Sequence, residues 1–243
     1  MNKQSVMIIL CLVAMISTMR PVLGSGPGLL EKSGVNFRDK AAIQRGAKWF
    51  VNYCLSCHSA SYMRYNRLAE DLDLDQDIVL RDLAFADVNI GDTMEIAMRP
   101  EDSKAWLGKT PPDLSVVSRS RGNDWLFTYM KSFYRDENGG WNNLVLPNAS
   151  MPHVFWQLQG IQEPVWSSHD EERVIAHLEL TAPGLQSPQE YEQTVRDLVT
   201  FLDYLGEPSK LKRKNIGIWV MLFLVVFTLV AYALKVEYWR DIH

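Results

Sequence analysis

Two cysteines and a histidine occur together in the run Cys54-Leu55-Ser56-Cys57-His58. Thiols at this spacing can form thioether bonds to the two vinyl groups of one haem, and the adjacent histidine can bind the iron from the same side. Two buried cysteines beside an unrelated histidine would give the same five residues by chance. A zinc site is a weaker interpretation, because no second pair of cysteines or histidines stands at finger-like spacing. The motif predicts one covalent haem c, held by Cys54, Cys57 and His58.

The second face of such a haem needs a ligand from further along the chain. Met151 lies in the run Pro147-Asn148-Ala149-Ser150-Met151-Pro152, where two prolines stiffen a loop that can cross this face. A thioether opposite an imidazole raises the reduction potential and closes the iron to substrates, which suits electron transfer. We therefore predict His58 and Met151 as the metal ligands, with His153 as a lower-potential alternative. The other candidates, whose methionines are more typical of core packing, are Met63, Met94, Met98, Met130, His169 and His177.

Two further segments could support a haem. Pro111 and Pro112 fix the backbone, so this segment can hold a carbonyl against the free ring N–H of the ligand histidine. A surface turn is the alternative interpretation of the same residues. Arg119 and Arg121 follow, and either guanidinium could pair with a haem propionate, because its geometry matches that of a carboxylate.

Two amphipathic helices are expected to form the core that positions these groups. The first begins after Asp39 as N-cap and ends at the haem motif. Its apolar face consists of Ile43, Ala47, Phe50 and Cys54. Gly46 inside this helix lowers helix propensity, which indicates close approach of another helix. The second begins at Ser187-Pro188, with Glu190 placed to complete a capping box, and should cross the first helix at Gly46.

The middle of the chain is less regular. Residues 92–99 suit one or two helical turns ended by Pro100, and another helix is expected from about Asp124. Residues 138–164 are rich in glycine, asparagine and proline but contain many apolar residues. We interpret them as a long loop that packs on a flat apolar surface, for which a haem face would serve. The prediction is a mainly α protein with long loops.

The sequence contains two membrane-directed segments. Residues 1–24, with Lys3 ahead of an apolar stretch, fit a secretory signal peptide, with an uncleaved anchor as the alternative. Residues 216–234 are 19 residues without charge, about 28 Å of helix, and predict one transmembrane helix. We expect a periplasmic cytochrome domain at 25–209, a basic linker at 210–215 and a cytoplasmic tail at 235–243. The basic linker conflicts with the positive-inside rule, but the exported domain fixes the orientation before the last helix is made.

Charge is unevenly distributed. Residues 25–209 contain 27 acidic and 17 basic residues, so the expected head is acidic. An acidic field speeds encounter with a basic partner and argues against nucleic acid as a ligand. Residues 70–77 form an acidic run, interpreted either as a solvated loop or as a docking surface for a basic protein.

Taken together, these motifs resemble the cytochrome c1 family. The matching residues are Arg45-Gly46, the haem motif with Ser59, Pro111-Pro112-Asp113-Leu114-Ser115 with Arg119 and Arg121, the run 147–152, Phe201-Leu202 and Glu207-Pro208. The resemblance implies a c-type cytochrome fold around one haem c, with Cys54, Cys57, His58 and Met151 bound to it. It also implies that Arg121 approaches a propionate and that Pro111 and Pro112 support the proximal histidine.

The family resemblance also implies partners and a place in the cell. The chain would accept electrons from a Rieske iron–sulfur protein and pass them to a c-type cytochrome, beside cytochrome b in a dimeric quinol–cytochrome c oxidoreductase. It would be a relay subunit of a respiratory complex in the bacterial inner membrane, in contact with lipid. The alternatives are the haem c subunit of a terminal oxidase and a haem peroxidase, which needs an open distal position.

Overall fold

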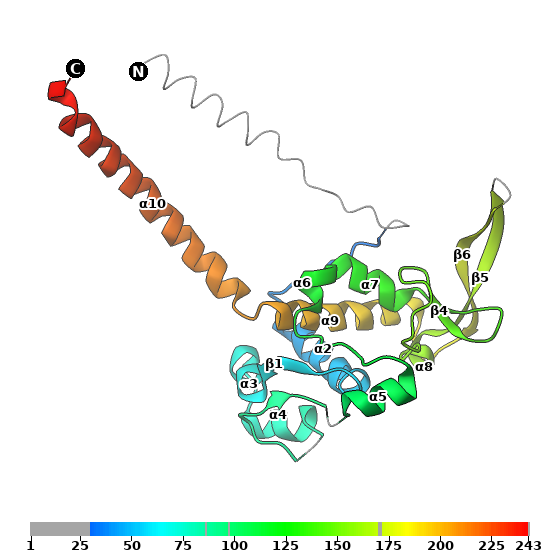
Figure 1. The fold of residues 1–243 in the computed structure, drawn as a ribbon. Helices are drawn as coiled ribbons and strands as arrows, with labels where there is room; N and C mark the ends of the chain where they lie inside the picture. Colours follow the sequence, from blue (N-terminus) through cyan, green and yellow to red (C-terminus); the bar gives the residue numbers. More distant parts are fainter. Residues whose placement is uncertain (1–29, 86, 97, 170–171, 243) are drawn as a thin grey trace.

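Two crossing helices form the centre of the head (Figure 1). The computed structural model describes residues 30–85, 87–96, 98–169 and 172–242, so the expected leader at 1–24 lies outside the described residues. Helix α2 (Lys40–Tyr53) begins as predicted, with the Asp39 side chain accepting a hydrogen bond from the Ala42 N–H at 3.0 Å. Helix α9 (Pro188–Gly206) begins with the predicted capping box between Ser187 and Glu190.

The crossing of these helices depends on Gly46. A β-carbon on Gly46 would lie 2.0 Å from the main-chain oxygen of Asp197 and 2.7 Å from the β-carbon of Phe201, so only glycine fits. Arg45 anchors the crossing: its Nε and one terminal nitrogen donate to the Asp197 carboxylate at 2.6 and 2.9 Å. The predicted role of Gly46 as a contact point is confirmed.

The other elements of the head are short. In chain order they are β1 (Ala60–Arg64), α3 (Tyr65–Leu72), α4 (Gln76–Leu83), β2 (Thr93–Met94), α5 (Pro100–Leu107), α6 (Val117–Arg121), α7 (Asn123–Lys131), β3 (Phe133–Arg135), β4 (Trp141–Asn143) and α8 (Trp156–Gln159). These strands form two-stranded antiparallel sheets, β1 with β2 and β3 with β4. Helices α6 and α7 pack on α9, and buried apolar residues of α2, β1, α3, α4, α7 and α9 form one core.

The prediction for residues 92–99 is wrong. Met94 pairs with Ala60 in the β1–β2 ladder, so this segment contains a strand where helical turns were expected. Pro100 begins helix α5 instead of ending one. Proline is well suited to the first helical position, because its missing N–H has no acceptor there in any helix.

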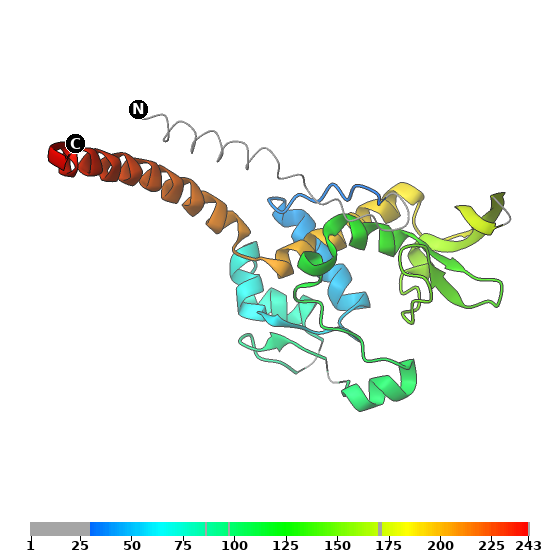
Figure 2. The same ribbon diagram turned by 45° about the horizontal axis from the view of Figure 1, so that its top comes forward.

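The region 138–164 is also more ordered than a loop, and it leads into a hairpin that the sequence did not predict. Strand β4 and helix α8 lie within it, and β5 (Gly160–His169) then pairs with β6 (Glu172–Pro183). Figures 1 and 2 show this hairpin leaving the head on the opposite side from the C-terminal helix. Gly160 has φ +96°, and a β-carbon on it would lie 2.2 Å from the Ala182 carbonyl oxygen, so glycine closes the base of the hairpin.

Helix α10 (Lys210–Tyr238) extends away from the head as one continuous rod. The segment Lys212–Tyr238 is long and apolar enough to cross a membrane: its most apolar 18-residue window has a mean hydropathy of 2.5, and none of that window is buried against the protein. The residues of the expected basic linker at 210–215 form the first turns of α10.

The acidic run 70–77 has local structural roles. Asp71 accepts hydrogen bonds from Tyr204 and Arg67, Asp73 pairs with Lys40, and the Asp75 side chain caps α4. The run lies beside the first turns of α2, whereas the haem motif follows the last turn. Because α2 has 14 residues, its two ends are about 20 Å apart.

Candidate functional site

The haem motif forms a turn at the C-terminal end of α2. Cys54 is the C-cap and donates its N–H to the Phe50 carbonyl at 2.8 Å, while the His58 N–H donates back to Cys54 at 2.8 Å. Cys54 and Cys57 are free thiols, the first buried and the second half-buried. Burial, and to a lesser extent the nearby Cys57, raises the pKa of the Cys54 thiol to about 12, so this thiol is neutral at physiological pH.

His58 is held in one orientation by the proline segment. Its Nδ1 lies 2.7 Å from the carbonyl oxygen of Pro112, so Nδ1–H donates and the lone pair of Nε2 stays free. Burial lowers the pKa of the His58 imidazole, although the Pro112 carbonyl and the charge of Asp113 act in the other direction. The ring is therefore neutral and can bind a metal through Nε2.

Asp113 fixes the proline segment onto the chain that leaves the motif. Its Oδ2 accepts from the N–H and hydroxyl of Ser61 at 2.9 and 2.8 Å, and its Oδ1 accepts from the Ser115 N–H at 2.8 Å. The Leu114 N–H donates to the Ser59 carbonyl at 2.8 Å. This clamp, which the sequence analysis did not identify, keeps the Pro112 carbonyl in place. Aspartate is a typical sequence signal for such a turn, because its side chain accepts from the backbone N–H two residues on.

Met151 belongs to a segment that packs at the same end of α2 as the motif. The ring of Phe155, four residues after Met151, lies 4.8 Å from the ring of Tyr53, which immediately precedes Cys54. Met151 is half-buried, and its sulfur accepts a hydrogen bond from the Tyr129 hydroxyl at 3.5 Å. Tyr129 is a second residue of this region that the sequence analysis did not select.

The other candidate ligands have different surroundings. Met63, Met94 and Met130 are buried in the hydrophobic core. His153 is also buried, stacked on Phe133 with ring centres 5.0 Å apart, and burial lowers its pKa to about 4. His177 is exposed on the hairpin, in strand β6.

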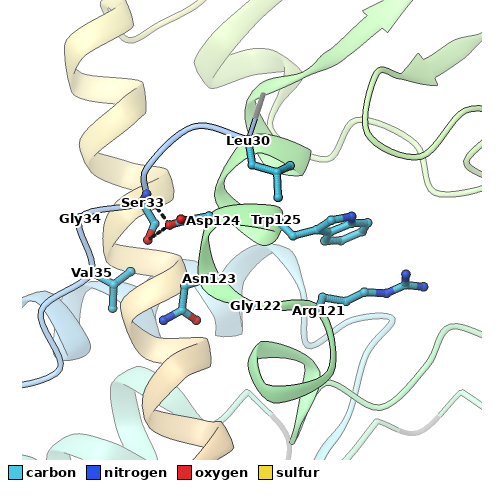
Figure 3. Close-up of a pocket in the computed structure, with 9 residues that line it drawn as sticks. All are labelled: Leu30, Ser33, Gly34, Val35, Arg121, Gly122, Asn123, Asp124 and Trp125. Atoms are coloured by element: carbon cyan, nitrogen blue, oxygen red, sulfur yellow. Dashed lines mark hydrogen bonds between the residues drawn. The ribbon is translucent and has the colours of Figure 1, made fainter. Parts of the chain in front are cut away.

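Arg119 and Arg121, the two candidates for a propionate contact, have different neighbours. Arg119 lies 3.9 Å from Glu207, whereas the Arg121 guanidinium lies 4.9 Å from the centre of the Trp125 ring and makes no ion pair within the described residues. Arg121 and Trp125 line an open pocket of about 460 Å³ with Asp124 and the segment 33–35. Figure 3 shows both side chains extending away from the hydrogen bonds between Ser33 and Asp124.

The apolar side chains of this region fit a flat apolar group. Several lie on the core without being fully buried, and they come from the end of α2, the motif, the proline segment, α6, α7 and the Met151 loop. They are Tyr53, Leu55, Leu114, Val117, Trp125, Val145, Ala149, Met151 and Val154. Together with two free thiols and an imidazole with a free Nε2, they suit a haem attached by thioether bonds. The fold and the site thus define a class, the membrane-anchored c-type cytochromes.

Comparisons with known proteins agree with this class. The model of the cytochrome c1 family matches residues 32–104 and 182–242. Cytochrome c1 from Allochromatium vinosum is 48% identical over 91% of this chain and 93% of its own length. A protein from Nitrosomonas europaea called ammonia monooxygenase gamma subunit is 45% identical over 88% of this chain and 89% of its own length. Cytochrome c1 from Blastochloris viridis is 28% identical over 84% of this chain and 82% of its own length.

The chain belongs to the cytochrome c1 family. Members carry one covalent haem c and are the haem subunit of the cytochrome bc1 complex, a membrane-anchored assembly of the electron transport chain. The predicted family, mainly α fold and cofactor are confirmed. The matches do not favour a terminal oxidase subunit or a peroxidase.

Proposed function

We propose that this chain relays single electrons from a Rieske iron–sulfur protein to a c-type cytochrome. The main support is the 2.7 Å hydrogen bond from Nδ1 of His58 to the Pro112 carbonyl oxygen. This bond leaves Nε2 of His58 free beside two free thiols. An imidazole fixed in this way is preorganised to bind one face of a haem. The haem supplies a reversible one-electron change at its iron.

The roles of the individual residues follow from their positions. Cys54 and Cys57 would hold the haem by thioether bonds, and His58 and Met151 would be the protein ligands of its iron. Arg121 pairs with a propionate, because it has no ion-pair partner among the described residues while Arg119 faces Glu207. Pro111 and Pro112 stiffen the segment that carries the accepting carbonyl. Two protein ligands leave no open position for a substrate, which suits a relay and not a peroxidase.

The proposed setting is a dimeric complex with cytochrome b and the Rieske protein, in a bacterial inner membrane with the head in the periplasm. The apolar helix α10 supports the anchoring, with lipid around it. A relative from Bradyrhizobium diazoefficiens called cytochrome b/c1 is 26% identical over 84% of this chain but only 34% of its own length. Its name joins the two proteins in one chain, which supports cytochrome b as a neighbour here.

The site assignment is tested by redox titration with visible spectra on membranes that contain the full chain. We expect Met151→Ala to change the spectrum and lower the midpoint potential, because the thioether ligand, which favours the ferrous state, is lost. Met94→Leu removes a methionine buried in the core and is the matched control, with an unchanged spectrum. An unchanged spectrum and potential in Met151→Ala would overturn the ligand assignment.

The partners are tested by purifying the complex from membranes. Recovery with cytochrome b and a Rieske protein is expected. The similarity to the protein called ammonia monooxygenase gamma subunit supplies a second candidate, a subunit of such a monooxygenase. Recovery with a monooxygenase core, without cytochrome b, would establish that function and contradict the first.

A further inference from the structure

We propose that Tyr129 is a positioning residue for Met151 and that its hydroxyl weakens the bond between the methionine sulfur and ferric iron. This inference rests on the proposed role of Met151 as an axial ligand. The observation behind it is the 3.5 Å hydrogen bond from the Tyr129 hydroxyl to Sδ of Met151.

Three buried tyrosines contact methionines, and the Tyr129 hydroxyl differs from the other two in its hydrogen-bond acceptor. The Tyr191 hydroxyl donates to the main-chain oxygen of Met130 at 2.7 Å, and the Tyr204 hydroxyl donates to Asp71 at 2.9 Å. Within the described part of the chain, the hydroxyl of Tyr129 has the Met151 sulfur as its hydrogen-bond acceptor and no oxygen acceptor. A buried hydroxyl needs a partner, so its direction is set by the sulfur.

The ring of Tyr129 is fixed by its neighbours. One face stacks on Trp125, with ring centres 4.9 Å apart and an interplanar angle of 10°. The ring of Phe133 meets it edge-on, also at 4.9 Å. Arg121 lies over the same Trp125 ring, so the residue proposed for a propionate and the residue proposed for Met151 belong to one stack. Such packing restricts the ring to one position and therefore the hydroxyl to a narrow range.

The backbone of Tyr129 is tied to the loop that carries Met151. Asn143 is fully buried, and its Nδ2 donates to the Tyr129 carbonyl at 2.8 Å. Its Oδ1 accepts from the N–H groups of Val145 and Leu146 at 2.9 and 3.2 Å. Tyr129 and the start of the methionine loop are therefore held in one frame, and the contact between hydroxyl and sulfur is built into the fold.

The electronic consequence follows from the two lone pairs of a thioether sulfur. One pair would bind the iron, and the other accepts the hydrogen bond from the Tyr129 hydroxyl. This hydrogen bond withdraws electron density from the sulfur, which then donates less to the iron. Weaker donation from the sulfur destabilises ferric iron more than ferrous iron. The hydrogen bond therefore favours the reduced state and raises the midpoint potential.

The test is Tyr129→Phe in the full chain, measured in membranes. This variant removes one oxygen and keeps the packed ring. We expect a lower midpoint potential, equal to a change of about two- to tenfold in the ratio of ferrous to ferric protein at fixed electrode potential. Tenfold is 59 mV for a one-electron couple. Added imidazole should displace the methionine from the ferric variant less readily than from the wild type, because the iron–sulfur bond is stronger.

Tyr204→Phe is the matched control. It also removes a buried hydroxyl near a methionine sulfur, 3.9 Å from Sδ of Met63, but that methionine lies in the core. Its potential and imidazole affinity should equal those of the wild type. Tyr129→Leu removes ring and hydroxyl together, so it should show the same shift in potential with a larger loss of stability.

The outcomes separate this inference from the proposed function. If Met151→Ala changes the spectrum while Tyr129→Phe leaves potential and imidazole binding unchanged, Tyr129 is only a packing residue and the inference is wrong. If Met151→Ala leaves the spectrum unchanged, the ligand assignment itself fails.

Discussion

The α-carbon of Gly46 faces the main-chain oxygen of Asp197 so closely that an added β-carbon would lie 2.0 Å from it. This contact sets the crossing of α2 and α9, and α2 carries the haem motif at its end. The position of the motif relative to the core therefore depends on a residue without a side chain.

Gly46→Ala should destabilise the head strongly. The new methyl group meets backbone, which cannot rotate away, so the helices must separate. We expect a loss of about 3 kcal/mol in the free energy of unfolding, the upper end of the range for overpacking. Chemical denaturation followed by circular dichroism measures it. Gly91→Ala is the control, because nothing lies within 4 Å of a β-carbon there, and equal stability of the two variants would contradict the contact.

Arg45→Met should also weaken this crossing. The Asp197 side chain is only 3% exposed, and removing its partner leaves a buried carboxylate whose remaining side-chain donor among the described residues is Gln193. Loss of one partner of a buried pair typically removes about 3–5 kcal/mol, and the half-exposed Arg45 reduces this to about 2 kcal/mol. Arg81→Met breaks an exposed pair with Asp82 and should leave the free energy of unfolding nearly unchanged. Equal losses in the two variants would show that the crossing does not depend on the ion pair.

Asp113→Asn should loosen the clamp on the proline segment and change the midpoint potential. Burial raises the pKa of the Asp113 carboxyl, but hydrogen bonds from Ser115 and Ser61 outweigh it, so the net pKa is lower than the ordinary 3.8. A lowered folded-state pKa means that the carboxylate stabilises the fold fully above pH 3.8 and that this stabilisation is lost as the pH falls through the lower value.

The pH dependence separates this charge effect from a change in packing. The stability difference between wild type and Asp113→Asn should be constant near neutral pH and shrink below about pH 4. Urea denaturation across this range measures it. A difference that stays constant down to pH 2 would show that the charge of Asp113 does not matter.

Neutralising the acidic run should slow the reduction of a basic acceptor at low salt, if the run is a docking surface. The variant replaces Asp71, Asp73, Asp75 and Asp77 by asparagine, and stopped-flow reduction at several salt concentrations is the measurement. Its stability must be measured in parallel, because three of these carboxylates make local contacts. Unchanged rates at all salt concentrations would assign the run to structure alone.

Local signals in the sequence were sufficient for several elements. Ser187, Pro188 and Glu190 predicted the start of α9, and Asp39 predicted the start of α2, because capping depends on neighbouring residues. The haem motif could be predicted for the same reason, because its residues are consecutive in the sequence. Residues 92–99 were predicted wrongly, because the pairing of Met94 with Ala60 is a contact between distant segments and overrides the local helical pattern.

The sequence by itself determined the C-x-x-C-H motif, the helix that ends in it, an apolar helix long enough to cross a membrane and the family resemblance. Each depends on residue types at fixed short spacing. Only the tertiary structure decided that Pro112 supplies the carbonyl to His58, that Asp113 holds it there, and that the Tyr129 hydroxyl points at the Met151 sulfur. These contacts join residues 22 to 54 positions apart, and their directions depend on how helices and loops pack, which no local pattern encodes.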